Sequence, residues 1–441
     1  MRKDNLLWLV DWSPAKSPQP LVLWAHLAEP PVRRLIDTPP SSSVRKSHFA
    51  SPNRSNPRLR RSPGFRHRQA SSMEALLEEL VEEILLRLPP GDPSSLARAA
   101  VVCRRWCRII SNPGFRRRFV QRHPVPPVLG LLANLRDADI DEENDFDFVA
   151  RFVPTTPFCP RFPDHRDRCA LDARHGRVLL TTTPWGSDLE VWDPVTDVLL
   201  ELAPLPQYMG DPFSWNATVL CADHGPCDHI DCHLGHFVVV FLDSNTGVMR
   251  VHLYLSEAAA WSPPMYGPEA TLHGVETLPT ALVGNALYFL IDATQSILEC
   301  DLATMNMSVI PLPLEHFVDF AVLTTMEDGQ LGFARIVGTR LFLWSMETGP
   351  EGHVGWSQVR VVELETLLPA DDFHISNDYV GFAHGFGVFF VPTAYRESIF
   401  SIDLNSGWVR KEDCGDGRTH GVVPYTSFYT PDFHQYGIAP V

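Results

Sequence analysis

Residues 75–119 read ALLEELVEEILLRLPPGDPSSLARAAVVCRRWCRIISNPGFRRRF, and this stretch sets the expected helical domain. Its first part predicts an amphipathic helix, because apolar residues recur every three or four positions while glutamates occupy the opposite face. The segment Pro89-Pro90-Gly91 ends this helix. The predicted apolar face consists of Leu77, Leu80, Val81, Ile84, Leu85 and Leu88.

Two further helices are expected in the same stretch. Asp92-Pro93 provides a cap and a first turn for the second helix, which we expect to run to about Ile110. A short third helix follows Asn112-Pro113-Gly114 and places Phe115 and Phe119 four residues apart on one face. Three helices in about 50 residues bury little apolar surface, and this segment has more apolar residues than such a core can hide. The surplus indicates a protein partner.

Residues 75–119 resemble an F-box, especially the version found in large plant F-box families. The family pattern joins an Ile-Leu-x-x-Leu-Pro element, a Leu-x-x-Ala-x-x-Val-Cys-x-x-Trp helix and a final Phe-containing turn, in the order seen here. One departure is Leu76-Leu77, which stands where the family usually has Leu-Pro. The matching residues are Ile84, Leu85, Leu88, Pro89, Leu96, Ala99, Val102, Cys103, Trp106 and Phe115.

The resemblance implies docking onto a Skp-type adaptor, and through it onto the cullin and RING subunits of an SCF-type ubiquitin ligase. In that family the F-box protein performs no bond chemistry, but raises the effective concentration of a target protein beside the charged ubiquitin-conjugating enzyme. An adaptor-independent interaction scaffold with a drifted F-box is the alternative, consistent with the missing proline. The residues expected to form the adaptor-binding face or the helical core are Leu77, Leu80, Val81, Ile84, Leu85, Leu88, Pro89, Leu96, Ala99, Val102, Cys103, Trp106 and Phe115.

Beyond residue 150 the sequence predicts an all-β region, because short apolar runs alternate with turn residues. A loose repeat is visible in HGRVLLTTT with LEVWDPVTDVLLELAPLP, and its anchors recur at intervals near the span of a four-stranded propeller blade. The VWDPVT stretch followed by Leu-Pro is similar to F-box-associated domains of plant receptors, which implies a kelch-like β-propeller of six or seven blades. A β-sandwich or an irregular barrel is the alternative. The anchors are Trp192, Tyr254, Cys300, Trp344 and Ile402.

The expected protein is therefore multidomain, with a small α domain followed by an all-β domain. Its parts are a disordered basic extension (1–72), the F-box (73–122), a Pro-rich and acidic linker or part of the first blade (123–150), and a target-binding propeller (151–441). A transit peptide or a nuclear-localisation arm is the alternative for the extension. The acidic run 137–147 lacks the central Gly and closing Glu of an EF-hand, so we interpret it as a solvated linker.

The charge distribution argues against nucleic acid as a ligand. Residues 1–72 hold 13 Lys/Arg and 4 Asp/Glu of the 37 and 53 in the chain, which leaves 24 and 49 and a net charge of −25 for the rest. The sequence contains no run of about 18 apolar residues, which is the length that a membrane-spanning helix requires. Nine cysteines, an odd number at low density and without a secretory signal, indicate a reducing compartment, the cytoplasm or the nucleus.

The stretch 221–236, CADHGPCDHIDCHLGH, contains thiol and imidazole donors of the kind that bind zinc. Its Cys-x5-Cys-x4-Cys spacing includes no Cys-x2-Cys knuckle, and the stretch lies within a β repeat. We therefore interpret it as a polar inter-blade loop, expect no cofactor, and keep a zinc-binding propeller as the second alternative. No nucleophile elbow, P-loop or His-Glu-x-x-His motif occurs, so no catalytic residue is predicted. The candidate zinc ligands are Cys221, Cys227, Cys232 and His236.

Overall fold

The computed structural model consists of two compact units, Met1–Ala70 and Ser71–Val441, and all the residues it describes lie in the second. The expected basic extension, the acidic run 137–147 and Leu76 lie outside the described residues. Among the residues that are described, no helix is long and apolar enough to cross a membrane. The structure describes residues 77–123, 125–136, 148–182, 188–205, 214–223, 227, 229, 232–245, 248–269, 274–291, 296–313, 321–348, 354–369, 380–385, 387–393 and 398–428.

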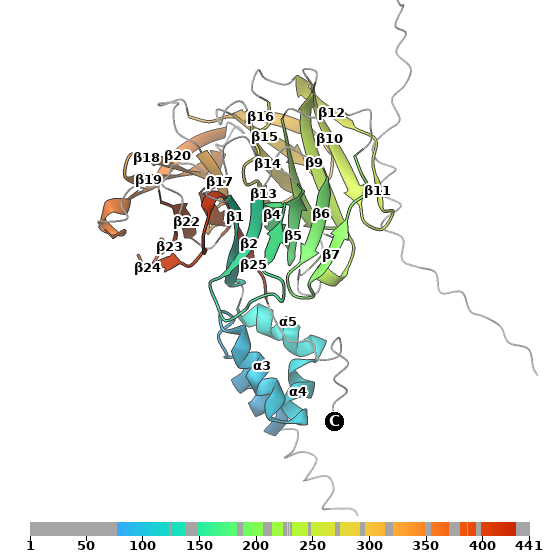
Figure 1. Cartoon of the computed structure of the whole chain (residues 1–441), viewed down its shortest axis with the longest axis vertical. Helices are drawn as coiled ribbons and strands as arrows, with labels where there is room; N and C mark the ends of the chain where they lie inside the picture. Colours follow the sequence, from blue (N-terminus) through green and yellow to red (C-terminus); the bar gives the residue numbers. More distant parts are fainter. Residues whose placement is uncertain are drawn as a thin grey trace, which may run out of the picture. The chain divides into compact units, whose positions relative to one another are not determined.

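The helical region comprises four helices within residues 77–123: residues 77–85, α3 (Pro93–Val102), α4 (Arg104–Ile110) and α5 (Pro113–Arg122) (Figure 1). The expectation of one second helix running to Ile110 was wrong, because Cys103 is extended, with φ −160° and ψ 159°. The β-branched pair before it, Val101-Val102, favours a helix weakly, so the chain can break there at low cost.

Two helices start where the sequence predicts them, but only the second start has a side-chain cap on a backbone N–H. Asp92 accepts hydrogen bonds from the hydroxyls of Ser94 and Ser95, both at 2.5 Å, and Pro93 opens α3. The side chain of Asn112 accepts a hydrogen bond from the backbone N–H of Gly114 at 2.7 Å, which satisfies one free donor at the start of α5.

The β region is a six-bladed propeller, at the lower end of the expected six or seven blades. Five blades contain four strands, and the third blade has a fifth, β12, which pairs with β10. The first three blades are β25 (Arg418–Thr426), β1 (Val128–Arg136), β2 (Phe148–Pro154), β3 (Asp164–Arg166); β4 (Cys169–Arg174), β5 (Arg177–Thr181), β6 (Leu189–Asp193), β7 (Val198–Glu201); and β8 (Trp215–Cys221), β9 (Phe237–Asn245), β10 (Val248–Leu255), β11 (Ala260–Trp261), β12 (Met265–Glu269).

The remaining blades have the same meander order, each strand pairing with the next along the chain. They are β13 (Ala281–Val283), β14 (Ala286–Ile291), β15 (Ser296–Asp301), β16 (Met307–Pro311); β17 (Ala321–Thr325), β18 (Leu331–Val337), β19 (Arg340–Thr348), β20 (Val354–Glu363); and β21 (Gly381–Ala383), β22 (Val388–Pro392), β23 (Ile399–Asp403), β24 (Val409–Glu412). Two short 3₁₀ helices, η2 (Cys232–Leu234) and η3 (Leu364–Thr366), lie among these strands.

The ring is closed by the last strand. β25 pairs antiparallel with β1, with Leu131 opposite Pro424 and Leu132 opposite Val423. It contacts β4 and β21, the first strands of the two neighbouring blades, so it takes the inner position that the first strand has in every other blade (Figure 1). β1 and the start of β2 lie in the range 123–150 that was expected to be a linker or part of the first blade.

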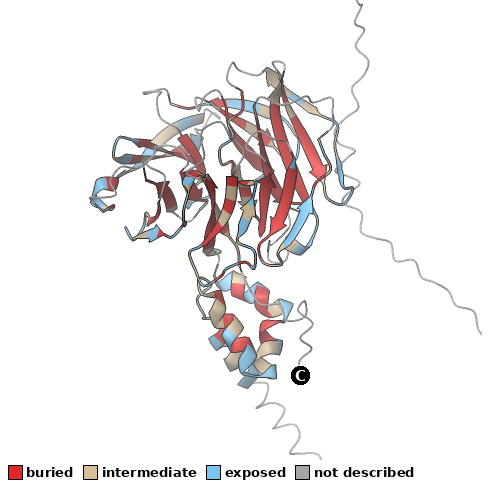
Figure 2. Ribbon diagram, in the orientation of Figure 1, coloured by how far each residue is buried: buried red, intermediate tan, exposed pale blue. Residues whose placement is uncertain are grey.

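The five repeat anchors each lie on the third strand of a different blade. Trp192 is on β6, Tyr254 on β10, Cys300 on β15, Trp344 on β19 and Ile402 on β23. Side chains from both faces of each sheet pack against neighbouring blades, which buries most strand positions and leaves outer strands such as β7 exposed (Figure 2). This burial on both faces explains why the strands are continuously apolar and do not alternate with polar residues.

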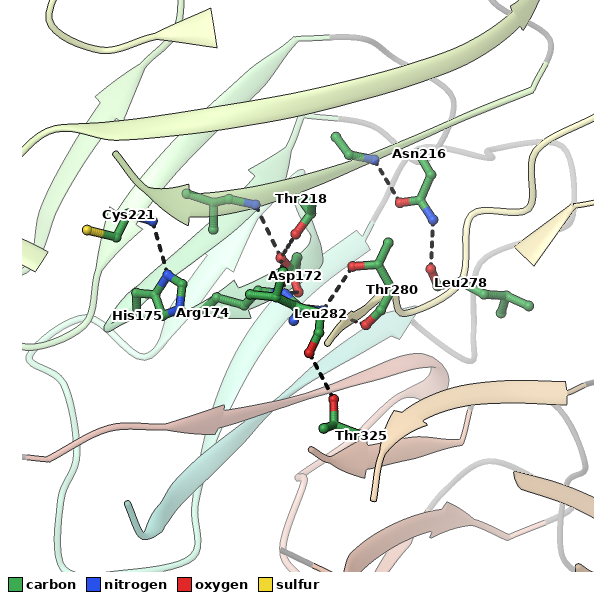
Figure 3. Close-up of polar contacts among 12 residues, drawn as sticks. Asp172, Arg174, His175, Asn216, Thr218, Cys221, Leu278, Thr280, Leu282 and Thr325 are labelled. Atoms are coloured by element: carbon green, nitrogen blue, oxygen red, sulfur yellow. Dashed lines mark hydrogen bonds and ion pairs between the residues drawn. The ribbon is translucent and has the colours of Figure 1, made fainter. Parts of the chain in front are cut away.

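A buried polar network joins the inner strands of different blades (Figure 3). On β4, the Asp172 carboxylate pairs with the Arg174 guanidinium at 3.0 Å and accepts a hydrogen bond from the hydroxyl of Thr218 on β8. Arg174 donates in turn to the backbone carbonyl and, at 2.9 Å, to the hydroxyl of Thr280 before β13. The chain therefore ties three consecutive blades together with one ion pair and its hydrogen bonds.

Asp172→Ala should lower the free energy of unfolding by about 3–5 kcal/mol, because it leaves the Arg174 cation buried without its counter-charge. Urea unfolding followed by tryptophan fluorescence measures this loss. The matched control is Asp164→Ala, which removes a carboxylate that pairs with Arg151 at 3.0 Å near the surface, and which should cost less than about 1 kcal/mol. Equal losses in the two variants would contradict the assigned role of the network.

The stability of the propeller should also depend on pH through His384, whose Nδ1 accepts a hydrogen bond at 3.2 Å from the backbone N–H of Thr325. Removal from water, and secondarily the Arg174 cation, lowers the pKa of His384 to about 3. Below about pH 6.5 the unfolded chain protonates this ring while the folded chain does not. The folded state therefore loses stability as the pH falls from about 6.5 toward 3.

His384→Asn keeps an acceptor near the Thr325 N–H but cannot titrate, so it should remove this dependence. We expect wild type to lose about 2 kcal/mol more than the variant between pH 7.5 and pH 5, at most about 1.4 kcal/mol for each unit below pH 6.5. Urea unfolding at several pH values tests this. Parallel stability profiles for the two proteins would show that His384 does not titrate as described.

Candidate functional site

The first helix, residues 77–85, has two apolar sides with different surroundings. Leu85 is buried, with 2% of its surface exposed, and it belongs to the helical core. Leu77, Leu80 and Ile84 are 51%, 62% and 61% exposed and follow each other at helical spacing. The predicted single apolar face is therefore divided between a core side and a solvent side.

A second group of exposed apolar residues lies at the end of α3. Val101 and Val102 are 74% and 65% exposed, and the thiol side chain of Cys103 is exposed beside them. Val101 was not predicted as a site residue, because it does not lie on the apolar face that a continuous second helix would have. We call Leu77, Leu80, Ile84, Val101 and Val102 the exposed apolar set.

The other predicted residues of the helical domain form or border its core. Val81, Leu88 and Trp106 are half-buried against this core, whereas Pro89 is exposed. The core also contains Leu86, Ile109 and Ile110, which were not among the predicted site residues. Its buried members are Leu85, Leu86, Leu96, Ala99, Ala100, Ile109, Ile110, Phe115 and Phe119.

Contacts from α5 fix the first helix in place. Glu82 pairs with Arg118, and Glu83 lies 3.4 Å from Arg122, so acidic residues of the first helix meet the basic residues of α5. The ring Nε2 of His123 lies within hydrogen-bonding distance, 3.0 Å, of the carbonyl oxygen of Leu86 at the end of the first helix. These contacts hold the exposed apolar side of the helix toward solvent without any contribution from that side.

The Cys/His stretch forms a cluster at the end of β8. The structure brings together Cys221, Cys227, His229 and Cys232, whose ligand atoms all lie within 4.8 Å of one another. His236, the fourth candidate predicted from the sequence, is exposed and is not part of the cluster. Within it, a hydrogen bond from Cys232 lowers the pKa of the Cys221 thiol, and the same contact raises the pKa of Cys232.

A cavity of about 360 Å³ lies between the fifth and sixth blades. Phe382 and Leu343 provide apolar lining, and Arg360 and Glu327 provide charge. Glu327 accepts a hydrogen bond at 2.7 Å from the side-chain amide of Asn405, which spans the two blades. A mixed apolar and charged cavity of this size can hold one or two side chains of a bound polypeptide.

Comparison with known families finds two matches along the chain. Residues 74–118 match the model of the F-box domain, a range that includes the first three helices and the first part of α5. Residues 169–377 match the model described as F-box protein AT5G49610-like, beta-propeller, which covers the second to fifth blades. Both families typically consist of non-catalytic adaptor or receptor proteins. A search of curated proteins finds no match.

Solved structures with a limited likeness to this chain are also found. TolB from Acinetobacter baumannii is 12% identical with a TM-score of 0.39, and the match covers 70% of each chain. A chain of the nidogen/laminin complex is 12% identical with a TM-score of 0.40, over 68% of this chain and 99% of that one. A functionally unknown protein from Desulfotomaculum acetoxidans DSM 771 is 10% identical, with a TM-score of 0.37, over 67% and 89%.

The neighbouring residues Ile84 and Leu85 provide a matched test of the two sides of the first helix. Leu85→Ala should destabilise the helical domain by about 2–5 kcal/mol, because it leaves a cavity in the core. Ile84→Ala should change stability by less than about 0.5 kcal/mol, because this side chain is exposed. Thermal unfolding followed by far-UV circular dichroism distinguishes them, and a larger loss for Ile84→Ala would reverse the assignment.

Proposed function

Because this chain is an F-box protein with a C-terminal β-propeller, we propose that it is a substrate-receptor subunit of an SCF-type ubiquitin ligase. The helical domain binds a Skp-type adaptor, which connects it to cullin and RING subunits. The propeller binds a target protein and holds it close to the charged ubiquitin-conjugating enzyme. The receptor contributes proximity and performs no bond chemistry of its own.

The observation that carries this proposal is the exposed apolar set on the helical domain. Five large aliphatic side chains, each more than half exposed, lie on a unit that already has a complete buried core. Such residues are not needed for folding, and burying one of them against a partner contributes about 1.5–3 kcal/mol. A protein surface of this kind is typical of an interaction site.

The rigid propeller supports the second half of the proposal. The inner network and ring closure fix the blades, and loops mounted on such a scaffold commonly form binding surfaces. The cavity between the fifth and sixth blades is a candidate subsite for the target, because it offers Arg360 and Glu327 beside an apolar wall. All nine cysteines are free thiols, which fits a protein that works in the cytoplasm or the nucleus.

The structure changes which residue tests adaptor binding. Leu85→Glu would place a charge in the helical core, so loss of binding would report unfolding. The exposed residues Leu80 and Ile84 avoid this problem. The double variant Leu80→Glu/Ile84→Glu should keep the fold and weaken binding to a Skp-type adaptor by at least tenfold, which corresponds to about 1.4 kcal/mol.

Binding is measured by co-expression with the adaptor followed by titration calorimetry of the purified proteins. The matched control is Val309→Glu, a similar change at a 44% exposed position on β16 of the propeller, which should bind like wild type. Far-UV circular dichroism confirms that both variants are folded. A folded wild-type chain that does not bind the adaptor would contradict the proposal and favour an adaptor-independent scaffold.

A further inference from the structure

We propose that Cys221, Cys227, His229 and Cys232 form a structural zinc site that anchors the loop between β8 and β9. The site is separate from the exposed apolar set and independent of adaptor binding. Three thiols and one imidazole lie close together here, and all four come from the twelve residues Cys221 to Cys232. The proposal concerns these four side chains and the residues that hold them.

The spacing of the donor atoms fits a single tetrahedral ion. Zinc bonds of about 2.3 Å to sulfur and 2.0–2.1 Å to nitrogen place tetrahedral ligands about 3.6–3.8 Å apart. The Sγ of Cys232 and the Nδ1 of His229 are 3.6 Å apart, and the four ligand atoms all lie within 4.8 Å of one another. A small closure of the loop would therefore complete the coordination sphere.

The type of donor identifies the metal class and its role. Three thiolates and one imidazole are the Cys₃His set of structural zinc sites, whereas calcium and magnesium prefer oxygen ligands. Because all four positions come from the protein, none remains for a catalytic water. The site would therefore stabilise the loop and would not activate a nucleophile.

The local backbone is arranged around the cluster. The backbone N–H of His229 donates a hydrogen bond to the Sγ of Cys227 at 3.3 Å, a contact that supports a metal-bound thiolate. His229 itself has φ 54°, a left-handed conformation that is unfavourable for a residue with a side chain and persists where the surroundings impose it.

A second layer of residues orients the ligands from the turn between β4 and β5. The ring of His175 stacks on the ring of His229, with centroids 3.8 Å apart and planes within 3°. The Nδ1 of His175 also accepts a hydrogen bond from the backbone N–H of Cys221 at 3.0 Å. One residue of the second blade therefore holds two of the proposed ligands of the third blade.

Arg177 supplies charge beside the cluster. Its Nη2 donates to the carbonyl oxygens of Cys232 and Gly235 at 2.5 and 2.6 Å, and the side chain is almost fully buried. Its Nη1 is buried without a hydrogen-bond partner among the described residues. A Cys₃His site that holds Zn²⁺ has a net charge of −1, so a buried cation at this place offsets the charge of the loaded site.

The loop between β8 and β9 is long, and this length indicates that a zinc ion there would stabilise it. The loop between β8 and β9 has fifteen residues, whereas the corresponding connections β4 to β5, β13 to β14, β17 to β18 and β21 to β22 have two to five. Connections longer than about 12 residues are uncommon in compact domains unless they have a function. A zinc ion would fasten the loop to the end of β8, which His175 of the β4–β5 turn contacts.

Metal analysis of the purified full-length chain tests the proposal directly. After extensive dialysis, the metal content measured by mass spectrometry should be about one zinc per chain. Replacing zinc with Co²⁺ should give a thiolate-to-cobalt charge-transfer band in the near ultraviolet and tetrahedral bands in the visible spectrum. A strong chelator should lower the melting temperature of wild type.

Matched variants assign the ligands. Cys227→Ser and Cys232→Ser should each abolish stoichiometric zinc and the cobalt charge-transfer band, and His229→Ala should weaken zinc binding by at least tenfold. His236→Ala changes an exposed imidazole of the same loop, and Cys159→Ser changes an exposed thiol outside it, so both should retain one zinc. Loss of zinc in either control would overturn the ligand assignment.

The wild-type measurements decide the proposal even where a variant fails to fold. A folded wild-type chain without bound zinc, and without a cobalt spectrum after metal addition, would overturn it. So would a disulfide between two of these cysteines, detected by thiol labelling and mass spectrometry under non-reducing conditions. Iron in place of zinc at the same ligands would overturn the choice of metal. Adaptor binding in the presence and absence of the chelator separates this site from the proposed ligase function.

Discussion

Closure of the ring by β25 is the constraint on which the rest of the propeller depends. The strand comes from the C-terminal part of the chain and pairs with β1, so the first blade is complete only when segments from the two ends of the propeller sequence meet. Pairing between residues almost 300 positions apart carries a large loop-closure entropy. Leu131 of β1 packs in one apolar cluster with Phe390 and Ile399 of the sixth blade, and this burial offsets the entropy because these contacts exist only in the closed ring.

The two halves of the protein solve the problem of stability differently. The propeller packs both faces of each sheet and leaves mainly its outer strands exposed. The helical unit is too short for this, and it fills its core with one side of the first helix while Leu80 and Ile84 remain in water. Ion pairs from α5 keep that orientation. The helical domain therefore has a buried core and still exposes apolar surface, which a larger core would have absorbed.

The sequence predicted the features that depend on local periodicity. It did not predict the features that depend on contacts between residues distant in the chain. Helical spacing and the Pro-Pro-Gly break predicted the helical unit, and anchors such as Trp192 marked the third strand of successive blades. The break at Cys103 was missed, because its apolar neighbours continue the helical line. His229 and His236 are equivalent as donors in sequence, and only the fold of the loop shows that His229 lies among the three thiols. The partnership with His175 was equally invisible, because it joins two blades.

The loop between β8 and β9 and the first helix share one physical principle, although they have opposite compositions. The first helix has more apolar side chains than its core can bury, whereas residues 222–236 contain only Ile230 and Leu234 as large aliphatic residues. A fifteen-residue loop with so little apolar surface cannot order itself by packing. The proposed zinc site offers an alternative, because bonds from three thiols and an imidazole to a metal ion would fix a polar loop without a hydrophobic core. The proposed function and the proposed zinc site would each add a group from outside the chain: a protein surface that covers the exposed apolar side of the first helix, and a metal ion that fixes the loop.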